Sequence, residues 1–250
     1  MTNKIRYFIA NWKMFGDLKS LKSIDKVVKF TKLNKKKKFK LVYCPPYTLI
    51  YPFFEKIKNT SIDIGAQNCH EENNFGAFTG SINSKMIKNL GAKFVIIGHS
   101  ENRSNGENDL LINKKIKSAL KNNLTVIFCI GESNIEKRKK KTNRVLRSQI
   151  LNGLKGVRSN NKIIIAYEPV WSIGTGVVPK NMELMKNIQF IQFTINQNFN
   201  FKKIKIIYGG SVSPKNIKDL NSITSLDGYL IGGASQSSKK LIDIVKKTFI

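Results

Sequence analysis

Eight short apolar stretches alternate along this chain with eight stretches of helical spacing or length, and this alternation constrains the fold more than any other feature. The expected strands are Arg6–Ala10, Lys40–Cys44, Ile62–Ala66, Phe94–Ile97, Thr125–Cys129, Lys162–Tyr167, Lys205–Tyr208 and Gly228–Ile231. The expected helices are Leu18–Thr31, Tyr47–Lys58, Asn83–Leu90, Glu107–Asn122, Glu136–Leu154, Met182–Asn198, Pro214–Leu220 and Lys239–Phe249. Strands that alternate with helices form βαβ units with parallel strands. Eight such units in 250 residues, without a linker, predict an α/β fold with one closed (β/α)8 barrel domain over residues 1–250, in preference to a doubly wound sheet.

The net charge of +28 raises the question of a polyanionic partner such as a nucleic acid. The lysines are dispersed, however, and cluster only at residues 35–38 and 137–141, in stretches expected to be solvated. Abundant Lys, Asn and Ile are also what the codons of an AT-rich genome produce. We therefore do not expect a nucleic-acid partner, although a basic surface would help to attract a small anionic substrate.

The cysteines and residues 1–13 indicate in which cellular compartment we expect the protein. Cys44, Cys69 and Cys129 are odd in number and lack metal-ligand spacing, which is typical of free thiols in a reducing cytoplasm. Residues 1–13 contain too short an apolar segment and no cleavage site, so they predict a first strand and not a signal peptide. No apolar run approaches the length of a membrane span. We expect a cytoplasmic protein without membrane association.

Unusual residues follow five of the expected strands. At the carboxyl ends of parallel strands they would share one face of the barrel, where such folds place their chemistry. They are Asn11 and Lys13 after the first strand, His99 and Ser100 after the fourth, Glu168 after the sixth, Gly209–Ser211 after the seventh, and Gly232 and Gly233 after the eighth.

Glu168 ends a buried strand, and Pro169 follows it without an N–H for the sheet. One interpretation is a general base, its pKa raised beneath an apolar loop that Gly174 and Gly176 allow to move. The alternative is a carboxylate paired with a cation or exposed at the rim. The residue alone leaves both open.

His99 and Lys13 each have an ordinary and a functional interpretation. His99 can be a polar residue satisfied by backbone, or a neutral imidazole that donates to a carbonyl, if Ser100–Ser104 begins a helix whose positive end disfavours imidazolium. Lys13 can be one more surface lysine, or a fixed charge for an anionic substrate with Glu101 as its partner and Asn11 donating to the same oxygen. His70 lies in a polar loop and is expected at the surface.

The paired glycines indicate a phosphate site. Gly209–Ser211 and Gly232–Gly233 would let backbone N–H groups approach an anion, and these two loops form a recurring phosphate site in barrels. No P-loop, dinucleotide fingerprint, metal-ligand cluster or Ser-His-Asp arrangement is present, so we expect neither a cofactor nor a metal. Together these candidates are a general base, a neutral electrophile, a fixed positive charge and a phosphate-binding site. This combination indicates an enzyme that transfers a proton beside the carbonyl of a small phosphorylated sugar.

The same residues carry a resemblance over the whole chain. Eight motifs in this order closely resemble the triosephosphate isomerase family, which has the (β/α)8, or TIM, barrel: Asn11–Met14 (NWKM), Gly65–Asn68 (GAQN), Gly76–Gly80 (GAFTG), Gly98–Glu101 (GHSE), Ala166–Trp171 (AYEPVW), Gly174–Gly176 (GTG), Tyr208–Ser211 (YGGS) and Gly232–Ser235 (GGAS). The resemblance implies interconversion of dihydroxyacetone phosphate and D-glyceraldehyde 3-phosphate through an enediolate, in glycolysis and gluconeogenesis and with a link to the pentose phosphate shunt.

Roles follow from the resemblance motif by motif. It implies that Glu168 shuttles the proton, that His99 serves the two oxygens, and that Lys13 and Asn11 bind substrate and stabilise charge. The implied phosphate ligands are the backbone N–H groups of Gly174, Ser211, Gly232 and Gly233, and the implied supporting residues are Ser100, Glu101 and Tyr208. The glycine-bearing loop would close as a lid and prevent phosphate elimination from the intermediate.

The resemblance also implies a homodimer. Gln67–Gly80 is longer than a bare strand-to-helix connection needs and would insert beside the neighbour's active site, with Thr79 as the inserted residue.

Three departures from the family pattern stand out. Ser81 and Asn102 replace a Glu and an Arg that usually pair, so both charges are lost together and the expected effect is modest. Ser172 replaces an alanine in the lid. Pro179 stands where many members have an alanine whose N–H bonds the Tyr208 hydroxyl in the closed lid, and proline has no N–H. Our hypothesis is that Pro179 stiffens the end of the lid.

Two other functions compete with this interpretation. Another phosphate-binding barrel, such as a sugar-phosphate epimerase or lyase, is disfavoured by the ordered motifs and would be distinguished by a coupled assay with glyceraldehyde 3-phosphate. A basic RNA-binding barrel is disfavoured by the intact catalytic positions and would be distinguished by salt-sensitive RNA binding.

Overall fold

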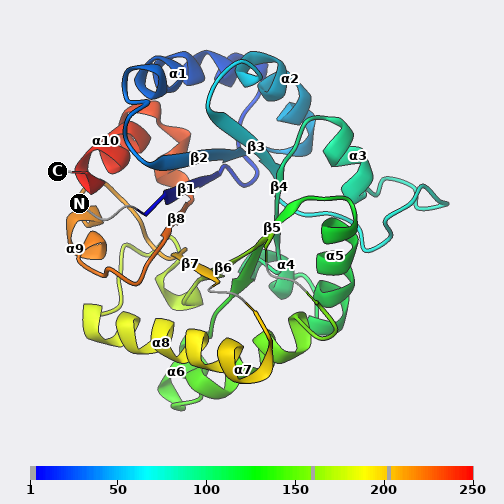
Figure 1. Ribbon diagram of the computed structural model, residues 1–250, viewed down its shortest axis with the longest axis vertical. Coiled ribbons are helices and arrows are strands. Elements are labelled where there is room, and N and C mark those ends of the chain that lie inside the picture. The colour runs from blue at the N-terminus through cyan, green and yellow to red at the C-terminus, as the bar shows by residue number, and fades with distance from the viewer. Residues whose placement is uncertain (1–3, 159–160, 202–203, 250) are drawn as a thin grey trace.

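The computed structural model describes residues 4–158, 161–201 and 204–249. Its strands are β1 (Arg6–Asn11), β2 (Phe39–Cys44), β3 (Ile62–Ala66), β4 (Phe94–Ile97), β5 (Thr125–Ile130), β6 (Ile163–Tyr167), β7 (Lys205–Tyr208) and β8 (Gly228–Ile231). Each strand pairs in parallel with the next, and β8 pairs with β1 to close the barrel. Figure 1 looks along the barrel, with the strands at the centre and the helices around them. The predicted closed barrel is confirmed.

The helices fill the connections between strands, with ends mostly within a few residues of those predicted. The main ones are α1 (Ile24–Leu33), α2 (Tyr47–Ile57), α3 (Ser84–Asn89), α5 (Asp109–Lys121), α7 (Thr142–Gly153), α8 (Asn181–Asn198), α9 (Ile217–Asn221) and α10 (Ser238–Thr248). The other helical pieces are α4 (Ser100–Ser104), α6 (Asn134–Arg138) and the 3-10 turns η1 (Leu18–Ser23), η2 (Val170–Ser172) and η3 (Gly233–Gln236).

Two predicted helices are not continuous. The stretch Glu136–Leu154 contains α6 and α7, separated by a turn in which Lys140 has a φ of 54°. Residues 137–141 are consecutive basic residues, whose repulsion disfavours one helix through this point. The stretch Leu18–Thr31 begins as the 3-10 turn η1, which the Asp17 side chain caps at the Ser20 N–H, and becomes α-helical only at Ile24.

The alternation of side chains along each strand decides what reaches the barrel mouth. On β6, Ile164 and Ala166 lie in the cluster that fills the barrel interior, whereas Ile163, Ile165 and Tyr167 belong to the layer between strands and helices. Successive side chains of a strand point to opposite faces, so Glu168 continues the inward row of Ile164 and Ala166.

The same alternation holds on other strands. Ile9, Ile207 and Leu230 also lie in the interior cluster, so Asn11, two residues after Ile9, extends this inward row to the mouth. Gly209 and Gly232 continue the rows of Ile207 and Leu230 in the same way. The apolar core thus determines which polar residues face the mouth.

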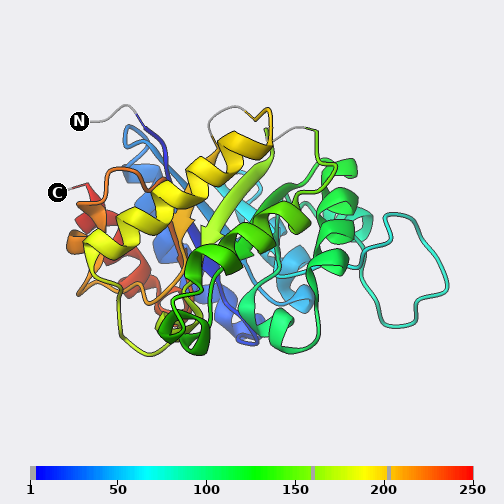
Figure 2. The same cartoon turned by 90° about the horizontal axis from the view of Figure 1, so that it is seen from below.

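The connection between β3 and α3, residues 67–83, stands away from the barrel body (Figure 2). Phe75 and Phe78 on it are 67% and 47% exposed. His70, at its start, is only partly exposed because its ring packs against Phe78, so the expectation of a simple surface histidine was incomplete. Among the described residues, no helix combines the length and apolar character needed to cross a membrane.

Candidate active site

A cavity of about 780 Å³ opens at the carboxyl ends of the strands. It is lined by eight residues that the sequence predicted for substrate or catalysis: Asn11, Lys13, His99, Glu168, Gly174, Ser211, Gly232 and Gly233. They come from five strand ends and from the lid, so only closure of the barrel brings them together.

Glu168 lies at the floor of this cavity and is 2% exposed. Burial raises the pKa of its carboxyl, and the nearby His99, the Cys129 thiol, Lys13 and the Ser100 N–H oppose that rise only in part. Oε1 lies 3.5 Å from His99 Nε2, and no described residue donates a hydrogen bond to Oε2. A desolvated carboxylate with a free oxygen is suited to accept a proton from a substrate.

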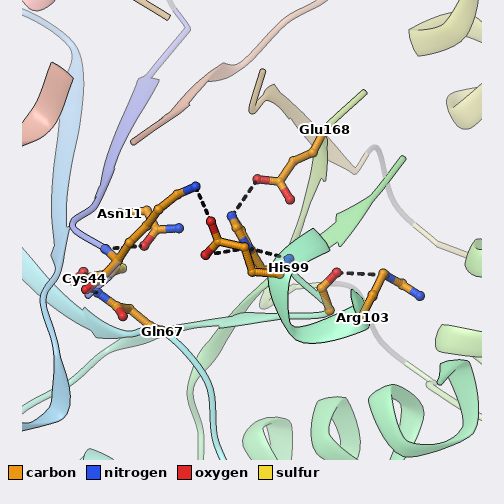
Figure 3. Close-up of polar contacts among 9 residues, drawn as sticks. Asn11, Cys44, Gln67, His99, Arg103 and Glu168 are labelled. Carbon is orange, nitrogen blue, oxygen red and sulfur yellow. Dashed lines mark hydrogen bonds and ion pairs between the residues drawn. The ribbon is translucent and has the colours of Figure 1, made fainter. Parts of the chain in front are cut away.

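His99 presents a neutral imidazole to this carboxylate. It precedes α4, the short helix on which its functional interpretation depended, and its Nδ1 accepts the Glu101 N–H at 3.2 Å. A nitrogen that accepts a hydrogen bond carries no proton, so the ring proton is on Nε2. The Glu101 carboxylate is farther from Nδ1, at 3.7 Å, beyond hydrogen-bond distance. Figure 3 shows the His99 ring and the Glu168 carboxylate facing each other.

Lys13 is held in place by three neighbours. Its Nζ lies 2.6 Å from Glu101 Oε1, the pairing that the sequence predicted. Its N–H donates to Asn11 Oδ1 at 3.0 Å, and Gln67 Nε2 donates to its carbonyl and to that of Cys44, both at 2.8 Å (Figure 3). Its φ of 55° is in the left-handed region, which costs a residue with a side chain free energy. The backbone contacts hold this strained conformation and aim the ammonium into the cavity.

This strain predicts an effect of backbone alone. Lys13→Gly should be more stable to urea than Lys13→Ala by about 1 kcal/mol, because glycine adopts a positive φ without steric cost. Both variants lack the ammonium, so the comparison is independent of charge. Equal unfolding midpoints for the two variants would contradict the assignment of strain.

The glycines of the cavity serve two different purposes. A Cβ built on Gly233 meets nothing within 4 Å, and one on Gly232 meets only Lys13 Cε at 3.6 Å, so their backbone is open to the cavity. At Gly209 a Cβ would come 2.6 Å from Glu168 Cγ, and at Gly210 it would overlap the Tyr208 hydroxyl. The sequence interpretation gave all four glycines an anion-binding purpose, but Gly209 and Gly210 make room for the protein's own side chains.

The loop over the cavity, residues 170–179, is the lid. Gly174 and Gly176 have φ values of 71° and 78° and are exposed, and the Gly176 N–H donates to Ser211 Oγ at 3.0 Å. Ser211 Oγ in turn donates to the Ser172 carbonyl at 2.7 Å. The lid therefore lies across the cavity with hydrogen bonds to the loop after β7.

Sequence reasoning missed a second buried carboxylate under the lid. Glu132 is fully buried, and burial raises its pKa. It accepts the Trp171 Nε1–H at 2.8 Å and the Tyr167 hydroxyl at 3.0 Å, and Asn187 donates to that hydroxyl at 2.8 Å. Its position three residues after the fifth expected strand was the available signal. Gln67 lies in the motif Gly65–Asn68, but sequence reasoning assigned it no role of its own. Its contacts to Lys13 and Cys44 appear only in the structure.

Four predicted residues lie outside the cavity lining. Glu101 pairs with Lys13, Ser100 begins α4 beside Glu168, and the Tyr208 hydroxyl contacts Ser172. Thr79 is exposed on the projecting segment 67–83, away from this chain's own cavity. In the part of the chain that the structure describes, no three His, Cys, Asp or Glu side chains group as metal ligands do.

Comparisons with known proteins agree over nearly the whole chain. A family model described as triosephosphate isomerase matches residues 6–248. A triosephosphate isomerase of Dictyoglomus thermophilum is 42% identical over 244 residues, which cover 95% of this chain and 97% of the relative. One of Thermodesulfovibrio yellowstonii is 40% identical over 246 residues, covering 96% and 98%. The crystal structure of triosephosphate isomerase from Bartonella henselae matches with a TM-score of 0.89 at 32% identity, over 98% of this chain and 99% of that one.

Proposed function

The chain belongs to the triosephosphate isomerase family and interconverts dihydroxyacetone phosphate and D-glyceraldehyde 3-phosphate in glycolysis and gluconeogenesis, and we propose that Glu168, His99 and Lys13 carry out this reaction. The observation that supports these roles best is the Glu168 carboxylate, which is buried, faces a neutral imidazole and has one oxygen to which no described residue donates a hydrogen bond.

The three side chains divide the chemistry of the enediolate. The Glu168 carboxylate removes a proton from C1 of dihydroxyacetone phosphate, and the C–H electron pair forms the C1–C2 double bond while the carbonyl oxygen gains charge. The His99 Nε2–H donates to the oxygens of C1 and C2, and the Lys13 ammonium stabilises the charge with Asn11. Through His99 Nε2, the hydroxyl proton of the C1 oxygen moves to the C2 oxygen. Glu168 then returns its proton to C2, and the C1 oxygen becomes the carbonyl of the aldehyde.

The phosphate of the substrate would bind at the glycine end of the cavity. We assign it to the backbone N–H groups of Gly174, Ser211, Gly232 and Gly233, which line the cavity beyond Lys13. Gly232 precedes η3, and N–H groups at the start of a helical turn favour an anion. The phosphate grip positions C1 and C2 for proton transfer.

Glu168→Asp tests the base assignment. The shorter side chain keeps the charge but draws the carboxylate back by about one methylene, and a misplacement of that size can cost about a hundredfold in rate. We expect kcat to fall by about a hundredfold in a coupled assay with glyceraldehyde 3-phosphate, with little change in KM. Wild-type activity in Glu168→Asp would rule out Glu168 as the base.

We further propose that residues 1–250 act as one domain in a cytoplasmic homodimer, whose triose product also links to the pentose phosphate shunt. The pairing of β1 with β8 supports a single domain, and three free, buried cysteines suit a reducing compartment. The exposed aromatics of segment 67–83 support insertion of Thr79 beside the active site of a second copy.

The homodimer is tested with two matched substitutions. Phe78→Asp places a charge where we expect burial, which should raise the dimer dissociation constant at least a hundredfold and lower activity at high dilution. Phe193→Asp changes a similarly exposed phenylalanine on α8, 54% against 47%, and should leave the dimer intact. Sedimentation velocity over a dilution series distinguishes them, and equal behaviour of the two would refute the proposed interface.

A further inference from the structure

Two buried hydroxyls tie the lid to the barrel. Tyr208 is the last residue of β7, and its hydroxyl oxygen lies 2.8 Å from Ser172 Oγ at the start of the lid. Both side chains have no exposed surface. Ser172 Oγ also lies 2.6 Å from the carbonyl oxygen of Val177, on the other arm of the lid. One serine oxygen thus connects the barrel wall to both arms of the lid.

The donor and acceptor roles in this chain follow from the atoms present. The Val177 carbonyl can only accept, so the single hydroxyl hydrogen of Ser172 goes to it. Ser172 Oγ must then accept from Tyr208, whose hydroxyl has this as its one hydrogen bond among the described residues. Burial raises the pKa of Tyr208 to about 12, so its proton is present at neutral pH. The Ser211 N–H also approaches Ser172 Oγ, at 3.4 Å.

Gly210 leaves space for the hydroxyls of Ser172 and Tyr208, and Pro179 offers no backbone N–H at the far end of the lid. A Cβ on Gly210 would overlap the Tyr208 hydroxyl and come 2.6 Å from Ser172 Oγ, so the pair requires glycine there. Pro179, where the second arm of the lid rejoins the barrel, is buried and has no N–H. Pro179 therefore has no N–H to donate to the Tyr208 hydroxyl, which bonds Ser172 instead.

We propose that the Ser172 hydroxyl is the positioning group that latches the lid over bound substrate, by joining Tyr208 of the barrel wall to Val177 of the lid. The proposal rests on the isomerase function and on the lid described above, but not on which residue is the base. An open lid moves Ser172 or Val177 away from these partners, so each opening breaks at least one of these two hydrogen bonds. The hydroxyl pair of Ser172 and Tyr208 therefore stabilises the closed lid. Because Pro179 has no N–H to bond Tyr208, Ser172 supplies this contact.

A weaker latch has a specific chemical consequence. If the lid opens while the enediolate is bound, the C3–O bond can break, its electron pair leaves with the phosphate, and a three-carbon enol remains that becomes a dicarbonyl compound. This elimination consumes no co-reactant, and it competes with return of the proton to carbon. The ratio of inorganic phosphate released to isomerisation turnovers therefore reports on lid closure during catalysis. A loss of global stability alone does not change this ratio.

The experiment is a double-mutant cycle on the two hydroxyls. Ser172→Ala, Tyr208→Phe and the double variant are compared with the wild type for kcat/KM and for phosphate released per turnover. We expect each single variant to raise the phosphate ratio and to lower kcat/KM by about tenfold, the size of one lost buried hydrogen bond. The double variant should be no worse than the worse single variant, because both remove the same link.

Two control variants remove buried hydroxyls elsewhere. The first is Tyr229→Phe. Tyr229 lies opposite Tyr208 on the neighbouring strand β8, is fully buried, and its hydroxyl has no hydrogen-bond partner among the described residues. Ser84→Ala removes a buried hydroxyl that lies 2.9 Å from Ser118 Oγ on the helix layer. Both should keep the wild-type phosphate ratio, even if the second lowers the melting temperature.

The outcomes separate the latch from the base assignment. Unchanged phosphate ratios in Ser172→Ala and Tyr208→Phe, or effects that multiply in the double variant, would overturn the latch. If Ser172→Ala does not fold, the phosphate ratio of Tyr208→Phe alone decides in the same way. Full activity of Glu168→Asp would refute the base without affecting the ratio, so the two proposals fail independently.

Discussion

Glu168→Gln should lower kcat by about a thousandfold and leave KM nearly unchanged, because general base catalysis contributes about 10²–10⁴ and glutamine cannot take a proton from carbon. The amide has nearly the shape of the carboxyl, so the cavity keeps its form. A coupled assay on purified protein measures the loss. Glu55→Gln, on the exposed face of α2, is the matched control and should retain wild-type activity. A retained kcat in Glu168→Gln would exclude Glu168 as the base.

The same substitution should stabilise the protein in a pH-dependent manner. The pKa of Glu168 is raised in the native state, so the native state binds its proton more tightly than the unfolded chain does. Below about pH 4.3, the ordinary value for glutamate, both states are protonated and the carboxyl costs no stability. As the pH rises through the raised native pKa, the buried group ionises and its cost is fully present.

Glutamine has no such cost, and the comparison of melting temperatures follows from this. Glu168→Gln should match the wild type near pH 4 and melt at a higher temperature near pH 7. The acid limb of wild-type kcat/KM should also lie above the ordinary glutamate pKa, and it should be missing from the residual activity of the variant. A lower melting temperature for Glu168→Gln at pH 7 would contradict the assignment of a raised pKa.

Lys13→Met should lower kcat/KM by about a thousandfold, through both a higher KM and a lower kcat. The ammonium is a fixed charge aimed at the cavity, and one lost group that stabilises a developing oxyanion costs about 10²–10³ in kcat. Stability should change little, because the partner Glu101 has a side chain that is 56% exposed and is solvated when the lysine is removed.

A control variant separates the effect of net charge from the effect of the position of Lys13. Lys36→Met removes the same unit of charge from an exposed site in the basic cluster 35–38 and should keep wild-type kinetics. If Lys36→Met lowered kcat/KM as much as Lys13→Met does, the effect would arise from attraction of substrate to the +28 chain and not from a charge at the site.

Local pattern was sufficient for the framework of the barrel. Each of the eight strands lies within a residue of its predicted bounds, because a short β-branched run with breakers at its ends has few alternatives. The period of two along β6 also places Glu168 on the inward row, so the direction of its side chain follows from sequence once the strand is known. The helix Glu136–Leu154 was wrong because helical spacing continues across the turn at Lys140, and spacing alone does not report a reversal of the chain.

The sequence by itself determined the eight alternating units, the five strand ends that hold the predicted site residues and the loss of an N–H at Pro179, since these depend on neighbours along the chain. Only the tertiary structure decided that Glu132 meets Trp171 and that the Tyr208 hydroxyl meets Ser172. These partners are 39 and 36 residues apart in the chain. Such contacts exist because the closed barrel brings the strand ends to one mouth, and the bonds made there depend on positions to within a fraction of an ångström, which no local pattern specifies.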